Sequence, residues 1–213
     1  MNTIQILVID YGSQYTRLIF HKLIYRFSDN TILIDFETFN SYSIEILEKE
    51  YPHLKAIILS GGPESVTSQN HPKIDFSIIN RYHVLGICYG AQLIAHEYGC
   101  QFTNIDNQSK SEFDKSKSEF DKYKSEFGLT EINLNNEISN IHCNYPNYFN
   151  NIPNNFNVWM SHNDVISNYN NNFLDILAYN NENIPVIWRV NTIDYQKEMI
   201  GFQFHIEVED TEY

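Results

Sequence analysis

Four short apolar runs rich in β-branched residues constrain this chain more than any other feature. They occupy Ile4–Ile9, Thr31–Phe36, Ala56–Leu59 and Val84–Ile87, and each is bounded by a turn signal or a polar stretch. Such runs predict buried strands. Gln14–Phe27, between the first two, carries one apolar stripe at helical spacing. Strand followed by helix predicts a parallel sheet with right-handed crossovers, covered on both faces.

Further helices are expected at Ile44–Glu50, Lys73–Tyr82 and Ala91–Tyr98, which makes the first hundred residues an α/β unit. Beyond Gly99 the composition changes, and the remaining apolar runs predict mostly strand. These runs are Glu131–Leu134, Val158–Ser161, Ile176–Tyr179, Pro185–Val190 and Met199–His205. We expect one domain over residues 1–213.

An internal repeat interrupts the second half of the chain. SKSEFDK at 109–115 recurs at 116–122, and YKSEF follows at 123–127. One phenylalanine per seven residues is too thin a stripe for a coiled coil, which needs two apolar positions per heptad. Residues 104–124 are therefore expected to form a flexible, solvated, low-complexity insertion that is at most transiently helical.

The charge of the chain excludes several kinds of partner. Fourteen Lys and Arg residues against 27 Asp and Glu residues leave a formal charge of -13, which repels phosphate backbones and anionic lipid. We expect no nucleic acid and no membrane as partners, and a basic protein surface as the natural one. The first residues lack the features of a signal peptide, and no apolar run reaches membrane-spanning length. A cytoplasmic location is expected.

The sharpest local motif is Gly86-Ile87-Cys88-Tyr89-Gly90, between a predicted strand and a predicted helix. G-x-C-x-G is the cysteine counterpart of the nucleophile elbow, in which glycines permit a tight turn that exposes a strained nucleophile. The following helix N-terminus favours the thiolate. From this pentapeptide alone, a catalytic thiol and a small buried apolar residue are equal alternatives. The three cysteines have no metal-ligand spacing, so no metal site is expected.

A cysteine nucleophile needs a base, and His205 with Glu207 can supply one. Extended backbone sends residues i and i+2 to the same side. A carboxylate there would accept a hydrogen bond from one ring nitrogen and turn the other toward the thiol. This is the arrangement of a triad with glutamate as the orienting group. The other histidines have a solvated or packed role as their default.

Acyl transfer also needs donors for the developing oxyanion. Ser60-Gly61-Gly62-Pro63 ends the third predicted strand, and loops at the carboxyl ends of parallel strands share one edge of the sheet. The second donor would be the amide N–H of Tyr89, which follows the nucleophile. Taken alone, Gly-Gly-Pro is first of all a turn.

Three separated segments, LSGGPESV at 59–66, LGICYGAQLIA at 85–95 and GFQFHIEV at 201–208, resemble the class I (triad) glutamine amidotransferases. VIDYGSQYTR at 8–17 and VWMSHNDV at 158–165 look like the amidotransferase domain of the GMP synthetases within that class. The resemblance runs from about residue 4 to about residue 211, apart from the repeat. It implies an α/β fold with a single open, mixed, mostly parallel β-sheet flanked by helices.

The resemblance implies hydrolysis of L-glutamine to glutamate and ammonia, which a synthetase uses to convert XMP to GMP with ATP and Mg²⁺. No cofactor is expected in this domain, and the expected partner is an ATP pyrophosphatase domain or subunit. The matched catalytic positions are Cys88 as nucleophile, His205 as base and acid, and Glu207 as orienter. Gly62 and Tyr89 match the oxyanion hole, and Gln92, Ser161, His162, Asn163 and Asp164 match places near the bound glutamine.

The chain departs from the family pattern in two places. Ile206 stands where family members usually have proline, which removes a fixed φ between base and orienter, and Ala91 replaces a usual methionine. Nothing resembles the ATP-binding loop of a synthetase. The chain is then expected to be either one subunit of a two-part synthetase or an excised domain of a longer protein. The repeat insertion and the Asn-rich loops resemble those of proteins whose synthetase is one polypeptide, which favours the excised domain. Two alternatives stay open: a glutamine-binding regulatory module that is nearly inactive in isolation, and the amidotransferase subunit of another synthase.

Overall fold

The computed structural model describes residues 3–27, 30–104, 126–135, 149, 151–191 and 197–212. The strands are β1 (Ile6–Asp10), β2 (Thr31–Asp35), β3 (Ala56–Leu59), β4 (His83–Ile87), β5 (Gln101–Asn104), β6 (Glu126–Leu134), β7 (Asn155–His162), β8 (Asp164–Asn168), β9 (Leu174–Asn180), β10 (Pro185–Val190) and β11 (Met199–Phe202). The helices are α1 (Thr16–Phe27), α2 (Phe36–Asn40), α3 (Ile44–Glu50), α4 (Phe76–Ile79) and α5 (Tyr89–Glu97).

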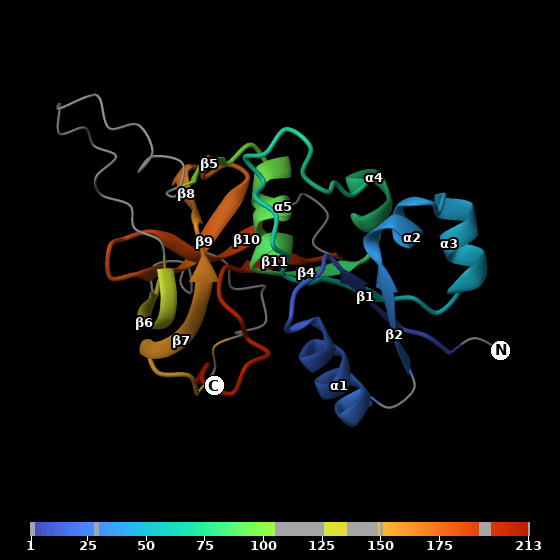
Figure 1. Ribbon diagram of the computed structural model, residues 1–213, viewed down its shortest axis with the longest axis horizontal. Helices are drawn as coiled ribbons and strands as arrows, with labels where there is room; N and C mark the ends of the chain where they lie inside the picture. The colour runs from blue at the N-terminus through green and yellow to red at the C-terminus, as the bar shows by residue number, and fades with distance from the viewer. Residues whose placement is uncertain are drawn as a thin grey trace.

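Within these residues, nine strands form one sheet in the order β2-β1-β3-β4-β11-β10-β9-β6-β7 (Figure 1). The strands from β2 to β11 pair in parallel. The strands from β11 to β7 pair antiparallel, and β5 pairs with β8 in a separate two-stranded sheet. The expected open, mixed sheet flanked by helices is confirmed, and its parallel half carries the elbow.

Successive side chains along a strand point to opposite faces of the sheet, so neighbouring residues of β1 pack against different helices. Leu7 and Ile9 of β1 pack in one core with Phe39 of α2 and Leu47 of α3, whereas Val8 packs with Ile19 of α1 on the opposite face. Figure 1 shows α1 alone on one face, with α2 to α5 on the other. Both faces of the parallel half are therefore covered, as buried parallel strands require.

Several predicted boundaries were wrong. The second strand ends at Asp35, because the Asp35 side chain accepts a hydrogen bond from the amide of Thr38 at 2.7 Å and caps the unpredicted helix α2. The predicted helix over 73–82 is shorter, from Phe76 to Ile79. The last strand stops at Phe202 rather than at residue 205. The sequence reading also missed the short strands β5 and β8.

The predicted insertion over residues 104–124 begins at Asn104, the last residue of β5, which pairs with Asp164. The rest of that segment lies outside the described residues. In the described part of the chain, no helix is both long enough and apolar enough to cross a membrane.

Candidate active site

Cys88 occupies a strained turn between β4 and α5. It has a φ of +49°, a conformation that non-glycine residues seldom adopt. A Cβ on Gly86 would lie 2.6 Å from both the amide nitrogen of Ala91 and the carbonyl oxygen of Gly90, and a Cβ on Gly90 would collide with the carbonyl of Leu59. The two glycines are needed for this close packing, whereas the positive φ of the turn is adopted by the cysteine itself.

The first turn of α5 lies directly behind the thiol. Cys88 is the residue before the helix, and the amide N–H of Tyr89 belongs to the first turn, whose amides have no partner within a helix. The positive end of the helix therefore favours a negative sulfur. Sequence reasoning predicted an exposed cysteine, but Cys88 is only 5% exposed and reaches solvent through a pocket.

His205 and Glu207 form a buried pair. His205 Nδ1 lies 2.7 Å from Glu207 Oε1, and the exposed fractions of the two residues are 4% and 3%. Because β11 ends at Phe202, this contact comes from the turn after the strand, and the predicted extended backbone is wrong here. The ring of Tyr15, which the sequence reading did not select, meets the imidazole edge-on at a centroid distance of 4.9 Å.

The protonation of His205 reflects its neighbours. Burial lowers its pKa, but hydrogen bonds from the imidazole to the side chains of Cys88 and Glu207, together with the charges of those groups, outweigh burial and raise the pKa to about 10. The imidazole is therefore held as a cation between Cys88 and Glu207. This is the state required of an acid that protonates a leaving group.

The Ser60-Gly61-Gly62-Pro63 loop is tied to the elbow. The amide of Gly90 donates to the carbonyl of Ser60 at 3.0 Å, and the amide of Tyr11 donates to Ser60 Oγ at 3.0 Å. A Cβ on Gly62 would lie 2.8 Å from the carbonyl oxygen of Tyr11, so only glycine fits there. Gly62 and Tyr89 both line the pocket beside Cys88, which places both expected oxyanion-hole residues at the site.

A polar network forms the side of the pocket that contains Gln92 and Asp164. Gln92 Nε2 donates to the carbonyl oxygen of Asp164 and to Gln203 Oε1, each at 3.3 Å. Gln203 Nε2 in turn points at Cys88 Sγ, at 3.9 Å. Gln203 was missed by sequence reasoning, although it lies in the same motif as His205. This chain of amides links the carbonyl of Asp164 to the sulfur of Cys88.

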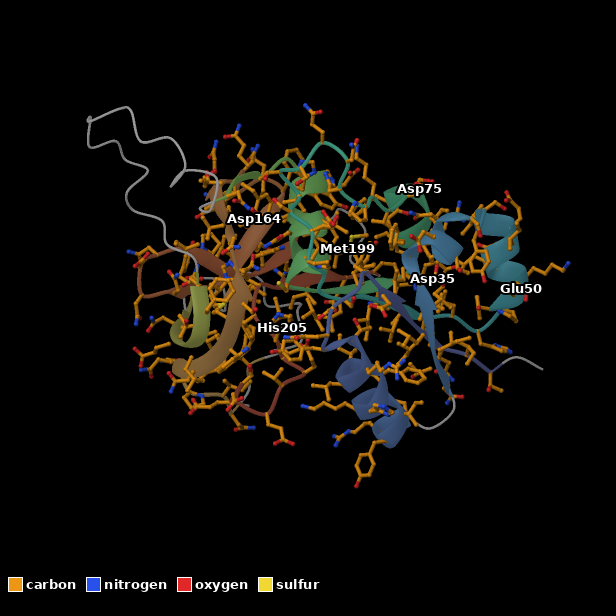
Figure 2. The ribbon with its side chains drawn as sticks, in the orientation of Figure 1. Asp35, Glu50, Asp75, Asp164, Met199 and His205 are labelled. Atoms are coloured by element: carbon orange, nitrogen blue, oxygen red, sulfur yellow. The ribbon has the colours of Figure 1, made fainter. Side chains whose placement is uncertain are left out.

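The pocket has a volume of about 360 Å³, near the lower end of the range of roughly 300–1,000 Å³ that is typical of small-molecule sites. Of the residues predicted for the site, Glu207 lies behind His205 and outside the pocket lining. The others all line the pocket: Gly62, Cys88, Tyr89, Gln92, Ser161, His162, Asn163, Asp164 and His205. Figure 2 shows His205 and Asp164 on the side of α5 that faces the antiparallel half.

Among the described residues, no cluster of three or more His, Cys, Asp or Glu side chains could hold a metal ion. A thiol and an imidazole line the pocket, and a carboxylate lies behind the imidazole. A thiol on a strained strand-to-helix turn, facing an imidazole that a carboxylate orients, defines the cysteine–histidine–glutamate class of α/β triad sites.

The chain belongs to the glutamine amidotransferase class-I family, whose model matches residues 7–213. The GMP synthase (glutamine-hydrolyzing) of Mesoplasma florum is 36% identical over 98% of this chain and 34% of that protein. The GMP synthase of Prochlorococcus marinus subsp. pastoris is 33% identical over 98% of this chain and 33% of that protein. The chain thus spans about a third of the length of these relatives.

Solved structures share the fold. A putative GMP synthase subunit from Thermoplasma acidophilum superposes with a TM-score of 0.68 at 22% identity, covering 100% of this chain and 89% of that one. A glutamine amidotransferase from Thermotoga maritima gives a TM-score of 0.62 at 14% identity, covering 98% and 78% of the two chains. The resemblance expected from the motifs is confirmed for the family and for the fold.

Proposed function

We propose that this chain hydrolyses L-glutamine to glutamate and ammonia through a thioester on Cys88. The observation that carries the proposal is the 2.7 Å contact between His205 Nδ1 and Glu207 Oε1 beside a cysteine elbow in the pocket. The carboxylate fixes the imidazole so that Nε2 is the nitrogen available to the thiol and the substrate.

In the first half-reaction the Cys88 thiolate attacks the carbon of the side-chain amide. The amides of Gly62 and Tyr89 stabilise the oxyanion, and the imidazolium of His205 transfers its proton to the amide nitrogen. The C–N bond then breaks, and ammonia leaves behind a γ-glutamyl thioester. In the second half, His205 takes a proton from water, which attacks the thioester carbonyl, and glutamate and the Cys88 thiolate are released.

The ammonia would serve a synthetase. Since the chain covers about a third of the GMP synthases that it resembles, we assign amination of XMP, with ATP and Mg²⁺, to a synthetase domain or subunit outside the described fold. We further propose that the two parts work in the cytoplasm. The formal charge of -13 on this chain would attract a basic face of the synthetase and so speed their association. Association of separately produced parts should slow as salt is raised, and a salt-independent rate would refute the electrostatic contribution.

The alternative of a nearly inactive binding module rests on Ile206 in place of proline. The orienting contact in this chain is nevertheless short, so we favour the glutaminase. The pathway assignment is preferred over another synthase because the relatives named above are GMP synthases.

The experiment is release of glutamate from L-glutamine by the wild-type chain, the Cys88→Ala variant and the Cys100→Ala variant, each with and without the synthetase part. Cys100 is also buried, and burial raises its pKa to about 12, which makes it the matched control. We expect Cys88→Ala to abolish release and Cys100→Ala to retain it. Equal rates in the wild type and Cys88→Ala would refute the proposal.

A further inference from the structure

Glu126, which the proposed mechanism does not use, lies outside the pocket lining and contacts His162 on the pocket wall. It is the first residue of β6 and pairs directly with His162 of β7 in the antiparallel register. Its Oε2 lies 3.1 Å from His162 Nε2, with the two side chains 13% and 2% exposed, respectively. A second bond fixes the carboxylate, because Asn180 Nδ2 of β9 donates to Glu126 Oε1 at 2.6 Å.

The other ring nitrogen of His162 is held by the backbone. Nδ1 lies 3.0 Å from the carbonyl oxygen of Asp164, and a carbonyl can only accept, so Nδ1 carries a hydrogen. Nε2 then faces a carboxylate oxygen, and two lone pairs would repel each other unless a proton lies on one partner. A proton on either partner holds the buried ring against the carboxylate at this distance.

The bond from His162 to Asp164 spans a bend between two strands. β7 ends at His162 and β8 begins at Asp164, with Asn163 as the single residue between them. The carbonyl of Asp164 that accepts from His162 also accepts from Gln92. The carbonyl of Ser161, one residue before His162, lies 3.7 Å from Cys88 Sγ. The position of the His162 ring therefore sets the position of a wall that touches the nucleophile.

We propose that Glu126 is a positioning residue for glutamine binding. It holds His162 in the orientation that keeps residues 161–164 against the substrate pocket, and it does not contact the reacting atoms. The inference rests on the proposed glutaminase function. It predicts an effect on substrate affinity, because the wall and not the triad would shift when the carboxylate is removed.

The test compares Glu126→Ala and Glu126→Gln in the glutaminase assay, with Glu131→Ala as the matched control. Glu131 is on the same strand and also accepts bonds from asparagines, but its side chain is exposed and it does not line the pocket. We expect Glu126→Ala to raise KM for glutamine about tenfold, the scale of one lost bond to a charged group, with kcat within about twofold. Glu126→Gln should recover most of the affinity, because its amide can donate to a neutral His162 and accept from Asn180.

A second measurement separates this inference from the function itself. Calorimetric binding of L-glutamine to Cys88→Ala and to Cys88→Ala/Glu126→Ala needs no turnover, and we expect the double variant to bind about tenfold more weakly. Unchanged affinity, or a Glu126→Gln variant as impaired as Glu126→Ala, would overturn the positioning role. Loss of kcat at constant KM would also overturn it. Failure of the Cys88→Ala comparison alone would instead count against the glutaminase.

Discussion

His205 Nδ1 lies 2.7 Å from Glu207 Oε1 although an isoleucine, and not a proline, separates the two residues. The backbone of His205 is held on both sides: its amide donates to the carbonyl of Trp159 at 3.0 Å, and Thr211 Oγ1 donates to its carbonyl at 2.6 Å. These bonds supply the rigidity that a fixed proline φ would otherwise give.

We expect Glu207→Gln to lower kcat for glutamine hydrolysis by at least about 10²-fold with little change in KM, because it removes the charge that stabilises the imidazolium during proton transfer. The measurement is steady-state glutamate release. Glu209→Gln, an exposed position two residues further along, is the control and should behave as the wild type. Wild-type kcat in Glu207→Gln would contradict the triad.

Stability should depend on pH through His205. Its pKa is raised from 6.5 to about 10 in the folded chain, so its proton stabilises the fold fully below pH 6.5, and this contribution is lost as the pH rises toward 10. Since Glu207 helps to raise that pKa, the gap in unfolding free energy between the wild type and Glu207→Gln should shrink from pH 6.5 to pH 10. Denaturant titrations across this range measure the gap, and a constant gap would refute the assignment.

The elbow glycines should tolerate no side chain. We expect Gly86→Ala to lower the free energy of unfolding by about 3 kcal/mol, because its Cβ would overlap the backbone of Gly90 and Ala91. Gly99→Ala is the control: its φ is +84° but its Cβ would meet open space, so it should cost only about 1 kcal/mol. Equal losses in urea unfolding would show that close packing at the elbow is not the reason for Gly86.

The parallel half of the fold was predictable because its signals are local. Ala56–Leu59 and Ile44–Glu50 have the predicted bounds, since continuous apolar runs and a Ser43 cap mark their ends. Helix α2 could not be predicted in this way. Phe36 continues an apolar run that predicts a strand, and only the cap made by Asp35 reveals where the helix starts. The short pairing of β5 with β8 depends on contacts distant in sequence, which no local pattern encodes.

The residues of the candidate site also fall into two groups, those that the sequence could predict and those that it could not. Cys88 and His205 belong to compact motifs whose spacing carries a chemical meaning, so residue types alone selected them. Tyr15 and Glu126 reach the site only through tertiary packing, against the ring of His205 and opposite His162 respectively. A family motif such as VIDYGSQYTR at 8–17 contains Tyr15 but does not say which of its side chains reaches the site, and that role emerges only once the strands are paired.

Covalent labelling tests the central claim, acylation of Cys88 by glutamine, most directly. The chain is treated with a chloroketone analogue of glutamine, and the modified peptide is located by mass spectrometry. We predict a single label on Cys88 that excess L-glutamine suppresses, that Cys88→Ala abolishes and that Cys100→Ala retains. A label on another residue, or a label on Cys88 that glutamine does not suppress, would contradict the claim.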